Sequence, residues 1–284
     1  MESNTMLSQA DFLGIEVPSI NSLKELQGLI KMAKELDIPV TQVNEVLGAS
    51  LIPKTELKEM LHLCAEEGLG ITLSTTVRPE YESDTAFYRT PWGREQGRRI
   101  NAPDKLQRAF DETVRFIEMG CRGFIIYDIG LARLLDTARK QGEIPSAVII
   151  KASTHCGITN YLSAQIHVEN GVDDVIPMHD LSLSALQSIR TAIPDVAMSV
   201  ITDTYATKGG FVRLFDVPGF IEKLCPLFLK MGNSLQHDPA SGASSDSLPA
   251  RMRRIRAILD ASEETLVKIG QPPKESRFYA VPVV

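Results

Sequence analysis

The chain of 284 residues is 43% hydrophobic and 23% charged, and its formal net charge is -6 at pH 7. This length fits one large domain, and the composition is that of a globular protein. The acidic balance disfavours nucleic acids and anionic membrane surfaces as partners. No apolar run approaches the roughly 20 residues of a membrane span, and the N-terminus lacks the pattern of a secretory signal. Four scattered cysteines without C-x-x-C spacing indicate reduced thiols, so we expect a cytoplasmic protein.

Short apolar runs alternate with amphipathic segments along the whole chain. The segments between the runs carry helix signals, among them Asn21 or Ser22 and also Ser182 as N-caps, Pro218 in a first turn, and Gly120 and Gly171 after last turns. The final helix is predicted over residues 250–269, before a Pro-rich tail. The apolar runs predict strands at residues 12–17, 40–46, 69–76, 121–127, 148–150, 174–177, 196–200 and 226–231.

Eight strands that alternate with helices are typical of the α/β class. The count favours a (β/α)8 TIM-like barrel, formed as a single domain by residues 1–284. A doubly wound open sheet is the alternative. The chain lacks a G-x-G-x-x-G pattern after its first strand and also lacks a P-loop, so the nucleotide-binding forms of that sheet lose support. No nucleotide cofactor is therefore expected.

Residues 77–101 interrupt the alternation with an irregular stretch that holds the only tryptophan, Trp92, and five arginines. A loop of this length inside a compact domain usually serves as a lid, a binding loop or a subunit contact. A lid and a subunit arm both remain open for this loop. The C-terminal tail is expected to pack along the surface or across to a partner. The inserted loop and the tail of the 250–284 segment together predict a homo-oligomer.

Polar residues crowd the carboxyl ends of the predicted strands, most densely around His155 and His179. In an α/β barrel these ends face one cavity, whereas the interior layers are usually filled by branched apolar side chains. The sequence therefore predicts a polar pocket for a small-molecule substrate. The residues at these positions are Glu16, Asn44, Glu45, Arg78, Tyr127, Asp128, Lys151, Ser153, His155, His179, Asp180, Asp203, Tyr205 and Lys230.

Two hypotheses use the histidines. In metal-assisted hydrolysis, His155, His179 and Asp203 bind a divalent ion, which lowers the pKa of its bound water to about 7. Glu45 and Asp128 are further oxygen ligands in this hypothesis. No compact ligand motif such as H-E-x-x-H supports it, so histidines that are only hydrogen-bonded rim residues are the alternative. In the metal-free hypothesis, either histidine acts as a base with Glu45 or Asp128 as its partner.

A third hypothesis is a Schiff-base aldolase or lyase with Lys151 or Lys230 as the amine nucleophile, because burial lowers the pKa of lysine. Lys230 lies within the apolar run LFLKMG. An ion pair with a neighbouring carboxylate is the alternative for both lysines. Cys156 follows His155 directly, and adjacent strand residues point in opposite directions, so no Cys–His pair is expected there.

Five short motifs follow one another between residues 122 and 200. They are GFIIYDIG at 123–130, ASTH at 152–155, TN at 159–160, ENGVDDV at 169–175 and HDLSL at 179–183. In order and spacing they resemble the collagenase-like peptidase family U32, and this resemblance implies a TIM-like barrel with its pocket at the strand ends. The family pattern has glutamine at His155, glutamate at Asp180 and a cysteine-rich segment near Asp203. Because this chain lacks those cysteines, no iron–sulfur cluster is expected.

The residues and the resemblance together predict a hydrolase-type barrel enzyme that acts on a C–N or related carbonyl bond of a small polar substrate. His155, His179 and Asp180 are its expected centre, with Glu45 and Asp128 as acid–base partners or metal ligands. A carbon–carbon lyase and a non-catalytic barrel used for binding or assembly remain alternatives. The residues expected to bind substrate are Glu16, Asn44, Arg78 as a carboxylate clamp, Tyr127, Lys151, Ser153, Asp203, Tyr205 and Lys230.

Overall fold

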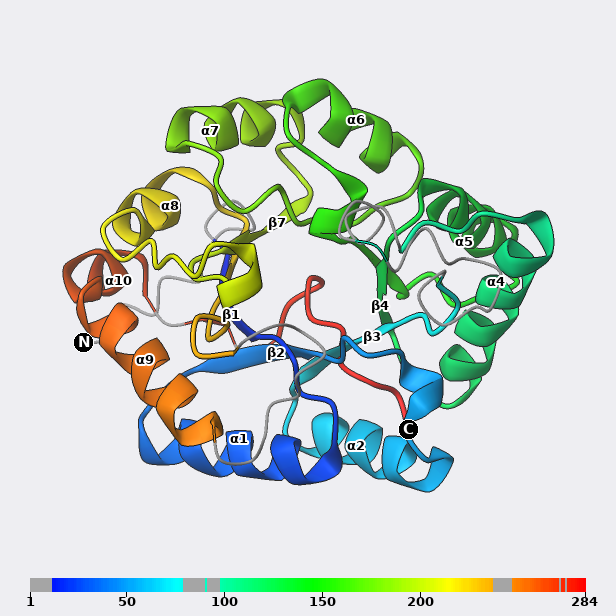
Figure 1. The fold of residues 1–284 in the computed structure, drawn as a ribbon, viewed down its shortest axis with the longest axis horizontal. Helices are drawn as coiled ribbons and strands as arrows, with labels where there is room; N and C mark the ends of the chain where they lie inside the picture. Colours follow the sequence, from blue (N-terminus) through cyan, green and yellow to red (C-terminus); the bar gives the residue numbers. More distant parts are fainter. Residues whose placement is uncertain (1–11, 79–89, 91–97, 237–246, 271, 274) are drawn as a thin grey trace.

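The computed structural model describes residues 12–78, 90, 98–236, 247–270, 272–273 and 275–284. Eight parallel strands form a closed barrel in chain order, with β8 paired back to β1. Helices surround this barrel (Figure 1), so the predicted (β/α)8 fold is confirmed. The strands are β1 (Leu13–Val17), β2 (Val40–Asn44), β3 (Gly70–Ser74), β4 (Gly123–Ile126), β5 (Ile149–Ala152), β6 (Asp174–Val175), β7 (Ala197–Ile201) and β8 (Leu227–Lys230).

Two of the helices begin at serines that act as side-chain caps. Ser22 and Ser182 accept hydrogen bonds from Glu25 N and Ala185 N, and these bonds satisfy amides that have no partner within the helix. The helices are α1 (Leu23–Glu35), α2 (Lys54–Glu66), α4 (Pro103–Glu118), α5 (Ile129–Gln141), α6 (Tyr161–Glu169), α7 (Leu183–Ala192), α8 (Val217–Lys223), α9 (Leu248–Asp260) and α10 (Glu263–Ile269). Three 3-10 turns, η2 (Ala49–Leu51), η5 (Thr154–Cys156) and η6 (Ala206–Lys208), follow β2, β5 and β7.

The helix predicted over residues 250–269 is in fact two helices, α9 and α10. The α-helical pattern ends at Ser262. Its amide donates to Leu259 O, three residues earlier, in place of the α-helical bond to the residue four earlier. The Ser262 hydroxyl donates to Ile258 O at 3.1 Å, so a local hydrogen bond competes with helix continuation. Glu263 and Glu264 then begin α10, where carboxylates favour a helix N-terminus.

The main apolar core lies between the barrel and its helices. Leu13, Ile15 and Val17 of β1 belong to this layer and are fully buried. Successive side chains of a strand point to opposite faces, so the intervening Gly14 and Glu16 face the barrel interior. The same alternation on the other strands gives the interior its own set of side chains. The inner set includes charged and polar side chains, whereas the outer core is apolar.

The interior is arranged in layers. Its lower layer contains Phe12, Ala197 and Phe228. Its upper layer, toward the carboxyl ends of the strands, contains Ile125, Tyr127, Ile176 and Ile201. Charged and polar side chains occupy the space between these two apolar layers, where barrels ordinarily place branched apolar residues.

The C-terminal tail closes the lower end of the barrel. Ala280 is fully buried, and its carbonyl accepts a 3.0 Å hydrogen bond from Ile71 N of β3. The aromatic rings of Phe278 and Phe12 are 4.9 Å apart between centroids. A Cβ on Gly123 would lie 2.4 Å from the Cβ of Ala280, so the tail needs a glycine on β4. In Figure 1 the middle of the red tail accordingly lies inside the ring of helices, whereas the tail was expected along the surface or across to a partner; its last residues, Val283 and Val284, are exposed.

Much of the predicted inserted loop, including Trp92, lies outside the described residues. Residues 77, 78, 90 and 98–101 of that loop are described. Within the described part of the chain, no helix has the length and apolar character that a membrane span requires.

Candidate active site

A network of buried charges fills the middle of the barrel. Glu16 of β1 is fully buried, and its two carboxylate oxygens are shared by two lysines. Its Oε1 atom lies 2.6 Å from Lys230 Nζ of β8. Its Oε2 atom accepts hydrogen bonds from Lys151 Nζ of β5 and, at 2.8 Å, from Gln42 Nε2 of β2. Side chains from four strands, β1, β2, β5 and β8, therefore join at the carboxylate of Glu16.

The two lysines have different further partners. Lys151 Nζ lies 2.7 Å from Asp174 Oδ2 of β6 and 3.0 Å from Ser199 Oγ of β7. Ser199 in turn donates to Asp174 Oδ2 at 2.9 Å. Lys230 instead donates to the side-chain oxygen of Asn44 on β2. The network thus contains two carboxylates and two amines, but Lys151 contacts both carboxylates and Lys230 contacts one.

This arrangement shifts the titration of its members. Burial by itself raises the pKa of Glu16, but the two ammonium groups outweigh it and lower the pKa to about 2. Burial also opposes the charge of Lys151, yet Asp174 and Glu16 together raise its pKa. For Lys230, burial and the nearby charge of Lys151 outweigh Glu16, and its pKa is lowered. The two amines are therefore electrostatically unequal.

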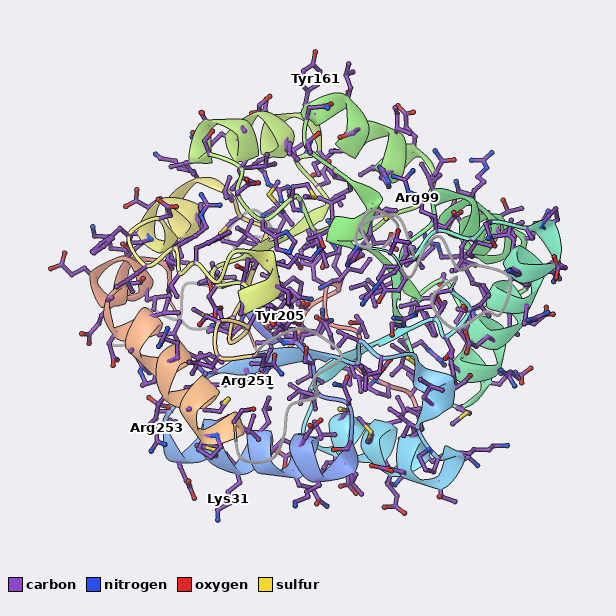
Figure 2. All side chains as sticks on the ribbon, in the orientation of Figure 1. Lys31, Arg99, Tyr161, Tyr205, Arg251 and Arg253 are labelled. Carbon is purple, nitrogen blue, oxygen red and sulfur yellow. The ribbon has the colours of Figure 1, made fainter. Side chains whose placement is uncertain are left out.

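A small pocket opens above the network, at the carboxyl ends of the strands. Its volume is about 50 Å³, enough for a ligand of only a few non-hydrogen atoms. Tyr205, which lines it, lies over the centre of the barrel in Figure 2. The described residues that line the pocket are Pro18, Val46, Arg98, Ile125, Tyr127, Ser153, Thr154, His155, Ile176, His179, Ile201, Tyr205, Lys208, Lys230 and Asn233.

Tyr127 is the aromatic centre of one wall. Arg98 donates to its hydroxyl at 3.2 Å and lies 5.0 Å from its ring centroid. The guanidinium of Arg78 lies 5.2 Å from the same centroid, and the His155 ring meets it edge-on at 6.0 Å. Cation–π contacts of this kind hold the guanidinium groups beside the ring. Across the pocket, Tyr205 forms a 2.8 Å hydrogen bond with Ser19, and burial raises the pKa of Tyr205 to about 12.

The pocket lining is electrically one-sided. Among the described lining residues, Arg98, Lys208 and Lys230 carry basic groups, and none carries a carboxylate. The whole chain has a net charge of -6, so this concentration of basic groups opposes the overall balance. Asn233 adds a buried Oδ1 atom that meets no hydrogen-bond donor within the described residues. A buried acceptor of this kind is normally satisfied by a partner, so it marks a place where a ligand can donate.

The structure divides the predicted strand-end residues into three groups. Those in the pocket lining are Tyr127, Ser153, His155, His179, Tyr205 and Lys230. Glu16, Asn44 and Lys151 lie beneath the pocket in the buried network. The remaining predicted residues serve the scaffold or lie apart from the pocket, for reasons that differ from residue to residue.

Three of the predicted carboxylates accept hydrogen bonds from backbone amides. Glu45 accepts from Gly48 N at 2.8 Å and from Ser74, so it fixes the loops after β2 and β3, and burial raises its pKa. Asp128 is the N-cap of α5 and accepts from Gly130 N at 2.8 Å. Asp203 accepts from Gly232 N and Ser234 N, both at 2.7 Å. None of the three lies in the pocket lining.

Two further predicted residues also lie outside the pocket lining. Asp180 is exposed to solvent. Arg78 is 1% exposed, and its guanidinium donates to the carbonyls of Thr75 and Val46 and to the Ser74 hydroxyl. An arginine bound to protein oxygens in this way does not act as an open clamp for a carboxylate.

The predicted metal ligands do not assemble. Across the described ranges, no three His, Cys, Asp or Glu side chains are placed to hold a metal ion together. His155 and His179 line the pocket, but both oxygens of Asp203 are used by the loop after β8. The structure therefore does not bring His155, His179 and Asp203 together as a ligand group within the described residues.

Cys156 is also unsuited to nucleophilic chemistry. Burial raises the pKa of its thiol to about 12, so almost no thiolate forms near neutral pH. Its sulfur donates to Ile126 O at 3.5 Å.

Sequence reasoning missed several residues. Arg98 belongs to the irregular loop, and Lys208 follows a strand end by several positions, so strand periodicity gave no signal for either. Asp174 and Ser199 complete the network because they face the interior of β6 and β7. Strand alternation alone predicts an inward face, and a search for polar residues at inward positions would have found both.

Comparison with known proteins gives one family match. The sequence pattern of peptidase family U32 matches residues 100–202. A search of curated proteins finds no match. Among solved structures, a U32 peptidase is 13% identical, with a TM-score of 0.44 over 72% of this chain and 74% of its own. A 4-hydroxy-2-oxoglutarate aldolase is 12% identical, with a TM-score of 0.45 over 88% and 95%. KGPDC from Streptococcus mutans is 14% identical, with a TM-score of 0.47 over 86% and 99%.

The matched segment runs from the residues before α4 to the end of β7. It includes Tyr127, His155 and His179 of the pocket, whereas Arg98 and Lys230 lie outside it. The resemblance expected for residues 122–200 is therefore confirmed: residues 100–202 of this barrel carry the sequence pattern of peptidase family U32.

Proposed function

We propose that this chain is a barrel enzyme that binds a small anionic compound containing a carbonyl group. The supporting observation is the lining of the pocket above the network, in which Arg98 and Lys208 supply basic groups, two histidines are present and no described residue carries a carboxylate. Basic groups in a partly dry cavity attract an anion more strongly than they would in water. The volume of about 50 Å³ limits the ligand to a few non-hydrogen atoms.

The lining also offers groups for proton transfer. His155 and His179 reach the pocket from the segments after β5 and β6. Histidine is the side chain that most often gives or takes a proton near neutral pH. Tyr127 and Tyr205 add hydroxyl groups that donate to a carbonyl or carboxylate oxygen. The pocket thus combines charge attraction for one end of the ligand with acid–base groups for a reacting carbonyl.

Hydrolysis of a C–N bond, the reaction predicted first, is the second candidate. It is favoured by the two histidines in the lining and by the match to a peptidase family over residues 100–202. In this reaction one histidine activates water and the other protonates the leaving nitrogen. The substrate would be an amide that also carries a carboxylate, since the lining of the pocket is basic.

The experiment measures binding by isothermal titration calorimetry. Pyruvate tests an anion with a carbonyl, lactate an anion without a ketone, and acetone a ketone without charge. We expect pyruvate and lactate to bind, with affinity that falls as salt rises, and acetone to bind weakly or not at all. Equal binding of acetone and pyruvate, or no binding of either anion, would reject the proposal. Release of ammonia from small carboxylated amides would select the hydrolytic candidate.

A further inference from the structure

The buried network treats its two amines differently. Lys151 lies between two carboxylates, Glu16 and Asp174, and also bonds to Ser199. Lys230 forms an ion pair with only one carboxylate, Glu16, and its other partner is the neutral amide oxygen of Asn44. An ammonium group in a dry interior is stabilised mainly by its opposite charges. Lys230 is therefore the amine of the two that is less strongly held in its charged form.

Access to the pocket distinguishes the same two residues. Lys151 is 0% exposed and does not belong to the pocket lining. Lys230 is 5% exposed and belongs to it, because it is the last residue of β8 and lies at the upper edge of the network. The amine that gives up its proton more readily is thus also the one that meets a ligand.

The surroundings of Lys230 suit a neutral amine. Burial and the positive charge of Lys151 lower its pKa, which increases the neutral fraction near pH 7. A second cationic group beside a lysine is a known way to activate an amine nucleophile. Its hydrogen bond to Asn44 persists in the neutral form, because an amine still has N–H groups to donate. The hydrogen bond to Asn44 therefore positions the Lys230 amine without stabilising its charged form.

We propose that Lys230 forms a covalent imine with the carbonyl carbon of a small keto acid. This inference rests on the proposed binding of an anionic carbonyl compound. The lone pair of the neutral amine attacks the carbonyl carbon, and the carbonyl π electrons move to the oxygen, which takes up a proton. The nitrogen loses a proton to give a carbinolamine. After a second protonation of the oxygen, the nitrogen lone pair expels water and leaves a protonated imine.

The overall change is amine plus ketone plus one proton to protonated imine plus water, with no oxidant or reductant. His155 and His179 are the pocket groups available to move the protons. The imine withdraws electrons from the adjacent carbon, so it supports breakage or formation of a C–C bond there. The inference therefore assigns the site to lyase or aldolase chemistry.

The test is reductive trapping on the wild-type protein. The protein is incubated with pyruvate and sodium cyanoborohydride, which reduces an imine to a stable amine, and is then analysed by intact mass and peptide mapping. We expect one adduct per chain, on the peptide that contains Lys230. No adduct, or an adduct only on Lys208 or on other lysines, would overturn the inference.

Variants separate chemistry from binding. Lys230→Arg keeps a long basic side chain at this position but cannot form an imine, so we expect the adduct to disappear, with folding checked by circular dichroism. Lys223→Arg, at an exposed position, is the matched control and should keep the full adduct on Lys230. If wild-type protein binds pyruvate and lactate calorimetrically without any adduct, the imine is rejected while the anion pocket stands. If neither anion binds, both proposals fail.

Discussion

Glu16 on the first strand and Lys230 on the last are joined by an ion pair of 2.6 Å, although 214 residues separate them in the chain. The same carboxylate binds Lys151 of β5, so one side chain ties together opposite parts of the barrel wall. Because these groups are buried, each charge depends mainly on its partners in the protein. This dependence makes the network sensitive to the loss of any member.

Replacing Glu16 tests that dependence. Glu16→Gln leaves Lys230 without a carboxylate and Lys151 with one, so we expect the free energy of unfolding to fall by about 3–5 kcal/mol. Urea denaturation followed by circular dichroism measures this change. Glu59→Gln, at an exposed position of α2, is the control and should change stability by less than about 0.5 kcal/mol. A Glu16→Gln variant as stable as the control would show that the network contributes little.

The pH dependence of stability follows from the same carboxylate. The pKa of Glu16 is lowered from its ordinary 4.5 to about 2 in the folded state, so the unfolded chain takes up this proton first as pH falls. Its contribution, about 3 kcal/mol, is complete above pH 4.5 and is lost as pH falls from 4.5 toward 2. We expect Glu16→Gln to lose less stability than wild type between about pH 6 and pH 3.5. Parallel losses in the two proteins would contradict the assignment to Glu16.

Arg98 is expected to govern affinity for the anion. It lies in the pocket lining and donates to the Tyr127 hydroxyl, so Arg98→Gln removes a positive group and loosens the tyrosine. Loss of a charge-assisted hydrogen bond to the anion raises the dissociation constant by roughly tenfold to hundredfold. Calorimetry with pyruvate measures it. Arg99→Gln is the matched control, since Arg99 is exposed and outside the lining, and its affinity should stay within about twofold of wild type. Figure 2 marks its position.

The tail is expected to stabilise the barrel from below. Phe278 packs on Phe12 and is 8% exposed, so Phe278→Ala removes a ring from a closed apolar cluster. We expect a loss of about 3 kcal/mol in the free energy of unfolding. Val267→Ala, at a position 76% exposed, is the control and should be nearly neutral. A variant with wild-type stability would mean that the tail is only loosely attached.

Much of the fold was predictable because its signals are local. Each strand is a short apolar run, and caps such as Ser22 and Ser182 depend on residues close by in sequence. The split between α9 and α10 was missed because helical spacing continues through Ser262, while the break depends on local hydrogen bonds. The buried tail was missed because its partners, such as Ile71, are distant in sequence.

The candidate site was predictable only in part. Barrel geometry places residues at strand ends together, and so Tyr127, His155 and Lys230 all line the pocket. Glu45 and Asp203 accept hydrogen bonds from backbone amides of nearby loops. These bonds depend on the loop conformation, which strand periodicity does not reveal. Carboxylates near turns frequently bind amides in this way.

The closure of the barrel also constrains how the chain is made. At typical synthesis rates of about 5–20 residues per second, the 214 residues between Glu16 and Lys230 take roughly 10 to 40 s to appear. Throughout that interval the carboxylate lacks one of its amines, and the open edge of β1 lacks β8. An emerging chain therefore carries an unpaired strand edge until near the end of translation, and such edges favour association with other chains. Ribosome-associated chaperones that shield strand edges should raise the yield of folded protein more than those that act after release.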